Sequence, residues 1–167
     1  MKKENKKTTK KEEVKEEIKQ MPAPLQIHTQ YIKDLSFEAP QMPFTIVSMK
    51  TPPKLEVSID TNAACVQKEE SRYTVELTVK LNAKNDEGKT TFLCELTYGA
   101  LVTLNVPNEH VQPLLLIEVP HLMFPYIRSI ISNTTRESGM VPLTLSPIDF
   151  AALYRSRIMK EQEKKTN

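Results

Sequence analysis

The feature that most constrains the fold is a stretch in which apolar and polar side chains alternate without interruption. In residues 72–82, RYTVELTVKLN, five apolar side chains fall at every second position and six polar ones lie between them. Successive side chains of a β-strand point to opposite faces, so this pattern predicts a strand with one buried and one solvated face. Sheets with one wet face are typically antiparallel.

Three further segments show the same alternation. They are residues 55–60, residues 91–104, and residues 25–31, where Leu25, Ile27 and Tyr31 share one side. In 91–104, Phe92, Cys94 and Leu96 share the apolar face, which leaves Leu93 and Glu95 on the other face. Residues 85–88, NDEG, form a turn signal. Four strands with short connections predict a four-stranded antiparallel meander.

Beyond Pro107 the spacing becomes helical. Residues 121–139 carry a wide apolar stripe, and Gly139 suits the left-handed position that ends a helix. Pro120 and Pro125 mark either the start of this helix or a kink, and the sequence leaves both open. One sheet face cannot cover so wide a stripe, so we expect an oligomer.

A last helix is predicted from Ser146, with Ser146 as N-cap and Pro147 at the first helical position. Ile148, Ala152, Tyr154 and Ile158 would form its apolar side. Strands followed by helices indicate an α+β fold.

The ends differ in composition from the middle. Residues 1–20 hold eight Lys and five Glu but few apolar residues, whereas the whole chain has 23 Lys and Arg against 21 Asp and Glu. We therefore expect a disordered tail at 1–24, a folded domain at 25–158 and a frayed tail at 159–167. Because the positive charge belongs to the tail and not to the folded domain, nucleic-acid binding is not expected. We interpret the tail as a solvating segment, and the alternative is a basic arm that contacts membrane lipid or nucleic acid.

Targeting and membrane signals are not found in the sequence. The lysines near the start are not followed by an apolar signal-peptide core, so a cytoplasmic protein is predicted. The longest unbroken aliphatic run, residues 114–117, is far below the ~20 apolar residues of a membrane helix, so direct membrane insertion is not expected.

Signals for catalysis or metal binding are weak. With three Gly in the chain, glycine-rich phosphate loops are improbable, and Gly88-Lys89-Thr90 lacks the earlier glycine of such a loop because position 83 is Ala. The two cysteines and three histidines show no metal-ligand spacing. We therefore predict a binding protein without cofactor or metal, not an enzyme.

Four segments, in the same order, resemble SecB, the bacterial protein-export chaperone family. They are YIKDLSFEAP at 31–40, TFLCE at 91–95, LMFPYIR at 122–128 and PLTLSPIDFAALY at 142–154. The resemblance runs from about Leu25 to Ile158. Two features depart from the family pattern: Thr51-Pro52-Pro53 stands where a Trp before Gln-Pro is common, and residues 1–20 form a Lys-rich extension.

This resemblance implies a homotetramer, built as a dimer of dimers with the long helices between sheets. It also implies an ATP-independent chaperone that keeps unfolded secretory precursors competent for translocation and delivers them to the translocase motor SecA. Any zinc would belong to the C-terminal segment of SecA. The alternative is a related chaperone that serves cytosolic clients or a toxin–antitoxin pair, which would not need an acidic SecA-binding surface.

By the resemblance, the SecA-binding residues are Asp34, Glu38, Leu93 and Glu95. The alternation supports this set independently, because Leu93 and Glu95 point away from the predicted core face. Carboxylates around an exposed leucine can steer and anchor a basic partner. For the client-binding groove we predict exposed apolar residues that accept diverse chains, namely Phe44, Leu55, Val57, Ile59, Phe124 and Tyr126. The alternative is that several of them belong to the core.

Overall fold

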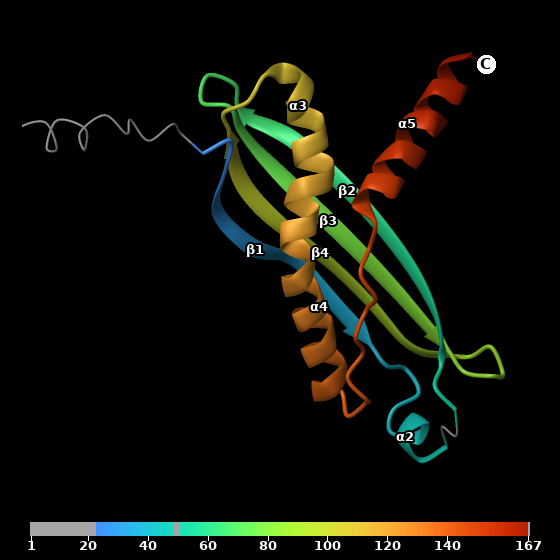
Figure 1. Cartoon of the computed structure of the whole chain (residues 1–167). Helices are drawn as coiled ribbons and strands as arrows, with labels where there is room; N and C mark the ends of the chain where they lie inside the picture. The colour runs from blue at the N-terminus through green and yellow to red at the C-terminus, as the bar shows by residue number, and fades with distance from the viewer. Residues whose placement is uncertain (1–22, 49–50, 167) are drawn as a thin grey trace, which may run out of the picture.

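The computed structural model describes residues 23–48 and 51–166, so residues 1–22 of the predicted tail at 1–24 lie outside the described residues. The strands are β1 (Leu25–Glu38), β2 (Lys54–Gln67), β3 (Arg72–Lys84) and β4 (Thr90–Leu104). The helices are α2 (Phe44–Ser48), α3 (Asn108–Pro113), the π-helical segment η1 (Leu114–Glu118), α4 (Val119–Glu137) and α5 (Phe150–Thr166). This order confirms the α+β fold class (Figure 1).

The four strands form one antiparallel sheet in the order β1-β4-β3-β2. The prediction of four antiparallel strands is confirmed, but only three of them, β2, β3 and β4, follow one another as a meander. Strand β1 instead pairs with β4, at the edge opposite β2. The connection from β1 to β2, which contains α2, therefore crosses from one edge of the sheet to the other, and the strand order is that of a Greek key. Strands β1 and β2 are also longer than the alternation predicted.

One face of the sheet is buried by a single long helix. Helix α4 packs on β4 and β3, and η1 packs on β2. Figure 1 shows the continuous helix lying along this face of the sheet. The apolar side chains of β3 and β4 that face it are fully or almost fully buried, among them Val75, Leu77, Val79, Leu96 and Val102. The alternation of residues 72–82 is thus confirmed.

The prediction for Tyr31 is wrong, because β1 is bulged. Its pairing with β4 shifts register between Ile27 and Thr29 and again between Ile32 and Asp34. Each inserted residue moves the following side chains to the opposite face. Tyr31 therefore lies on the outer face, over Gly99, rather than on the core face with Leu25 and Ile27.

The long helix begins earlier than predicted. It runs without a break from Asn108 to Glu137, so neither Pro120 nor Pro125 starts it. At η1 the N–H of Val119 donates to the carbonyl of Leu114, five residues back, and this wider turn lies between Pro113 and Pro120. Gly139 has φ +81°, as its predicted helix-ending role requires.

By length and composition alone the helix Asn108–Glu137 could cross a membrane. In this fold one side of it packs on the sheet, while the apolar side chains of Leu122 and Tyr126 remain exposed. The prediction that no segment is long and apolar enough for a membrane helix therefore does not hold for this helix. The helix is apolar on more than the one side that its own sheet covers.

The last helix begins at Phe150, four residues after the predicted N-cap. The carboxylate of Asp149, not the hydroxyl of Ser146, accepts the bond from the N–H of Ala152, at 2.8 Å. Phe150 is buried and packs edge-on against Phe124, with ring centroids 5.8 Å apart. Of the predicted apolar side, Ala152 is exposed while Tyr154 and Ile158 are half-buried, and the helix continues past Ile158 to Thr166.

The contact between Tyr31 and Gly99 yields a stability prediction. A Cβ atom at position 99 would lie 2.5 Å from Cζ of Tyr31, so Gly99→Ala should lower the free energy of unfolding by about 1–3 kcal/mol. In a Tyr31→Ala background the same change should be neutral or stabilising, since alanine restricts the unfolded chain more than glycine does. Urea unfolding of the four chains at one protein concentration measures this. An equal cost in both backgrounds would show that the ring is not the obstacle.

Candidate functional site

The outer face of the sheet, which the helix does not cover, brings the four predicted partner-binding residues together. Across the β1–β4 pairing, Glu38 lies opposite Leu93, and Asp34 lies opposite Thr97, two residues beyond Glu95. Leu93 is exposed and Glu95 is half-buried, while Cys94 between them is turned into the core. Asp34, Glu38, Leu93 and Glu95 are called the acidic surface below.

Ion pairs neutralise part of the outer face. Glu95 pairs with Lys80 at 2.8 Å and Glu56 pairs with Lys84 at 2.9 Å. Further along, Glu76 accepts a hydrogen bond from Lys33 at 2.6 Å, which raises the pKa of the lysine ammonium. Within the described residues, no ion pair engages Asp34 or Glu38. These two carboxylates are therefore available to a cationic partner.

A shallow pocket of about 380 Å³ lies on this surface, and Glu38, Leu93 and Glu95 are among the residues that line it. An apolar side chain flanked by carboxylates can receive a short segment that carries both basic and apolar groups. Nucleophilic chemistry is disfavoured here. Burial raises the pKa of the Cys94 thiol to about 11 and keeps it protonated at neutral pH.

A second pocket, also about 380 Å³, lies where the connection into β2 meets the segment that follows α4. Phe92 forms part of its wall and is itself stacked on Phe37, with ring centroids 5.6 Å apart. The lining is apolar apart from one threonine and consists of Thr51, Pro52, Pro53, Leu55, Phe92, Met140, Val141, Pro142 and Leu143. We call it the apolar pocket.

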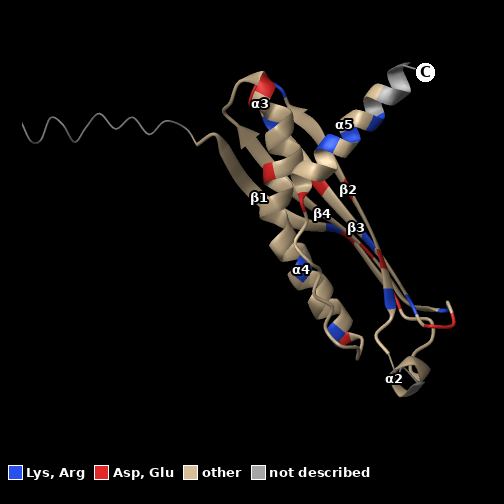
Figure 2. Cartoon of the chain, turned by 45° about the vertical axis from the view of Figure 1, so that its right-hand side comes forward, with Lys and Arg blue, Asp and Glu red and all other residues tan. Residues whose placement is uncertain are grey.

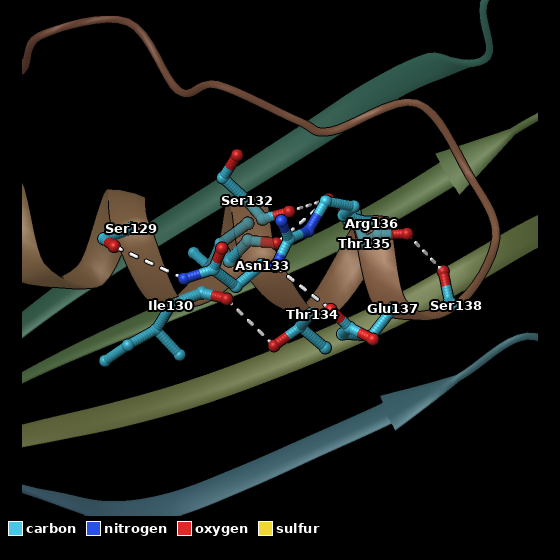
Figure 3. Close-up of polar contacts among 10 residues, drawn as sticks. Ser129, Ile130, Ser132, Asn133, Thr134, Thr135, Arg136, Glu137 and Ser138 are labelled. Atoms are coloured by element: carbon cyan, nitrogen blue, oxygen red, sulfur yellow. Dashed lines mark hydrogen bonds and ion pairs between the residues drawn. The ribbon is translucent and has the colours of Figure 1, made fainter.

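The C-terminal end of α4 fixes one wall of the apolar pocket. The buried hydroxyl of Thr135 donates within its own helix, to the carbonyls of Ile131 and Ser132, and accepts a hydrogen bond from the N–H of Leu143 at 2.9 Å. One turn further on, the hydroxyl of Ser138 donates to the Thr135 carbonyl at 2.6 Å (Figure 3). These bonds hold residues 140–143 beside the sheet.

The predicted groove residues do not form one groove. Leu55 lines the apolar pocket, and Phe44 is exposed on α2. Val57 is exposed on β2 and lines the pocket of the acidic surface, whereas Ile59 lines a third pocket, described below. On α4, Tyr126 is exposed and stacks on Tyr98, with centroids 6.4 Å apart.

Phe124 must be corrected, because it is a core residue. It is 5% exposed and packs against Phe150. Phe124 and Tyr126 are two residues apart in the sequence, and positions with this spacing lie on different sides of a helix. The two residues could therefore not line the same groove.

Sequence reasoning missed the wall made by residues 140–143. These residues have no periodicity, so pattern analysis assigns them only to a loop. The signal that could have found them is a run of apolar residues, Met140, Val141 and Leu143, directly after the helix-ending Gly139.

A third pocket, of about 400 Å³, lies between α5, η1 and β2. It is lined by Ile59, Asp60, Thr61, Leu116, Leu153, Tyr154, Ser156, Arg157 and Lys160. Arg157 donates a hydrogen bond across it to the carbonyl of Thr61, at 2.6 Å. Among the described residues, no group of three His, Cys, Asp or Glu side chains is placed to hold a metal ion.

Comparison with known proteins identifies the family. Residues 18–161 match the family described as preprotein translocase subunit SecB. The chain is 44% identical over 140 residues to a protein-export protein SecB of Rhodospirillum rubrum, covering 84% of this chain and 86% of that protein. It is 46% identical over 142 residues to the SecB of Gluconacetobacter diazotrophicus, covering 80% of this chain and 83% of that one.

The fold has a solved counterpart. A SecB-like chaperone of Mycobacterium tuberculosis, solved in complex with a peptide from an antitoxin, superposes with a TM-score of 0.63 at 15% identity, covering 75% of this chain and 91% of that one. At this identity the likeness concerns the fold. The family match and the similarity to the curated relatives agree with the sequence motifs, and the chain belongs to the SecB family of protein-export chaperones.

Proposed function

We propose that this chain is a cytoplasmic, ATP-independent chaperone that binds unfolded precursor proteins and delivers them to the translocase motor SecA. The observation that carries the proposal is the presence, on one subunit, of two surfaces of different chemistry on opposite faces of the sheet. The apolar pocket suits an unfolded chain, and the acidic surface suits a basic docking segment. Membership of the SecB family supports both assignments.

Client binding would use side chains and main chain together. The apolar pocket accepts an aromatic or aliphatic side chain, and nothing in its lining selects for one sequence. Beside it, β2 is an outer strand of the sheet, paired with β3 on one side only. An extended client segment can pair with such an edge through its main chain, which all sequences share. This combination explains how sequence-diverse precursors could bind one site.

The assembly we propose is a homotetramer, a dimer of dimers. Leu122 and Tyr126 are exposed on α4, and Ile32 and Leu35 are exposed on the neighbouring edge strand β1. Large apolar side chains clustered in this way normally contact another subunit. A second copy of the chain would cover them and leave the outer face of the sheet free.

Light scattering tests the assembly and the activity together. The purified chain should have a mass near four chains, and without ATP it should suppress the aggregation of a secretory precursor diluted from urea. We expect the mass of a tetramer because apolar surface on α4 and β1 is uncovered in one chain. We expect suppressed aggregation because the apolar pocket can bind the unfolded precursor. A monomer that leaves aggregation unchanged would contradict the proposed function.

The apolar pocket can be tested with Val141→Asp. Val141 is 84% exposed, so the fold should tolerate aspartate, but a bound client would bury an unpaired carboxylate there. Affinity for a denatured precursor, measured by fluorescence titration, should fall about tenfold or more.

The matched control is Val66→Asp, at an exposed valine near the other end of β2. This variant should bind as the unmodified chain does. Equal losses in the two variants would show that the effect is general charge repulsion and not occupancy of the apolar pocket.

The acidic surface can be tested with Glu95→Lys. The change removes a carboxylate and places a second ammonium beside Lys80, so titration calorimetry should find SecA binding weakened at least about tenfold. Tetramer mass and client capture should be unchanged, because the side chain lies on the outer face.

Glu70→Lys is the control for this charge reversal, since Glu70 lies in the turn between β2 and β3 and pairs with Arg72. It should bind SecA normally. Normal binding by Glu95→Lys would place the docking surface elsewhere.

A further inference from the structure

The two edge strands of the sheet differ in how readily their main chain can pair with an added strand. An edge strand exposes unpaired N–H and C=O groups that can pair with another chain, and bulges are one means of preventing this. Strand β1 has two register shifts along its length. Strand β2 pairs regularly with β3 from Lys54 to Cys65, and its one shift falls at the end, between Cys65 and Gln67. The regular edge of β2 is therefore the one suited to accept a further strand.

Helix α5 reaches this edge. The pocket of about 400 Å³ is lined by Ile59, Asp60 and Thr61, three consecutive residues of β2. Consecutive residues of a strand face opposite sides of the sheet, so a pocket that all three line lies along the strand's edge. Arg157 crosses the pocket and donates from Nη1 to the Thr61 carbonyl at 2.6 Å. Figure 2 shows α5 beside β2, with basic residues along the helix.

We propose that Arg157 is a displaceable cap on the β2 edge, which an extended segment of an unfolded client must replace in order to pair with β2. The inference rests on the proposed chaperone function and adds a residue that regulates it. The Thr61 carbonyl is the group to which a main-chain N–H of an added strand would donate. The guanidinium occupies that oxygen while no client is bound.

An arginine suits this role for chemical reasons. It carries several N–H donors on a long, flexible stem, so it can reach the strand from a helix and withdraw without unfolding that helix. The helix is anchored elsewhere, through the buried Phe150 and the Asp149 cap. Loss of the bond to Thr61 therefore does not require α5 to leave the domain.

The experiment uses two fluorescent peptides of about twelve residues that alternate valine and threonine and carry no charge. One has ordinary amides, and the other is N-methylated at alternate residues along one edge, which removes the donors for strand pairing. Both are titrated into the full-length chain, into Arg157→Ala and into Arg157→Gln. Arg155→Ala is the matched control, because Arg155 lies on the same helix and only approaches Asp149, at 4.0 Å.

Arg157→Ala should bind the ordinary peptide about threefold to tenfold more tightly than the unmodified chain, which corresponds to one lost hydrogen bond. Arg157→Gln, which keeps a donor but has a shorter stem, should fall between them. Arg155→Ala should match the unmodified chain. With the N-methylated peptide, the advantage of Arg157→Ala should vanish.

Three results would overturn the inference. They are equal affinity of Arg157→Ala and the unmodified chain, an identical gain with the N-methylated peptide, and a gain that Arg155→Ala shares. An increase in mass of Arg157→Ala with concentration would also overturn it, because the cap would then guard against pairing between copies. If the unmodified chain binds neither a peptide nor a denatured precursor, the proposed function itself fails, and that result is distinct from the other four.

Discussion

The structure depends on one constraint: one long helix, together with side chains of the segment that follows it such as Leu145 and Phe150, must bury one face of a four-stranded sheet. Neighbouring strands lie about 4.8 Å apart and a helix with its side chains is about 10–12 Å wide, so one helix covers roughly two strands. Helix α4 accordingly covers β4 and β3, whose inward side chains are fully buried. The edge strands remain partly uncovered, with Ile32 of β1 at 48% and Val57 of β2 at 45% exposure. The candidate client and assembly surfaces follow from this shortage of cover.

The two uncovered edges present different chemistry. On the β1 side, exposed side chains of the strand and of α4 form an apolar area with bulges that prevent open-ended pairing. On the β2 side, a regular edge lies between the apolar pocket and α5. If a client buries about 300 Å² in one subunit, the gain is ~7 kcal/mol before entropy costs. Such contacts are individually reversible, and in the proposed tetramer several subunits together would hold a long chain without ATP.

Much of the fold could be predicted because the period of a strand is local. The alternation around Leu93 and Glu95 assigned both residues to the outer face, and no tertiary information was needed. The position of Tyr31 was missed because the sequence alternates through His28, where the structure inserts a bulge. The apolar pocket was missed because residues 51–55 and 140–143 meet only in the folded chain, where the Thr135 hydroxyl holds Leu143 in place. The starts of the two predicted helices were wrong for different reasons. Pro120 and Pro125 lie inside a continuous helix that contains a π-helical turn, and the carboxylate of Asp149, not Ser146, caps the last helix.

Four consecutive residues of β4, 92–95, contribute to both the proposed client surface and the proposed partner surface, because successive side chains of the strand point to opposite faces of the sheet. Phe92 points inward and lines the apolar pocket, whereas Leu93 and Glu95 point outward to the acidic surface. A client and SecA would therefore contact opposite sides of the same strand without competing for space. A shift of the strand caused by one would be felt at once by the other, because packed interiors transmit small displacements. If the chain is the chaperone proposed above, the thinness of a single sheet would give it a direct physical route between binding a partner and releasing a client.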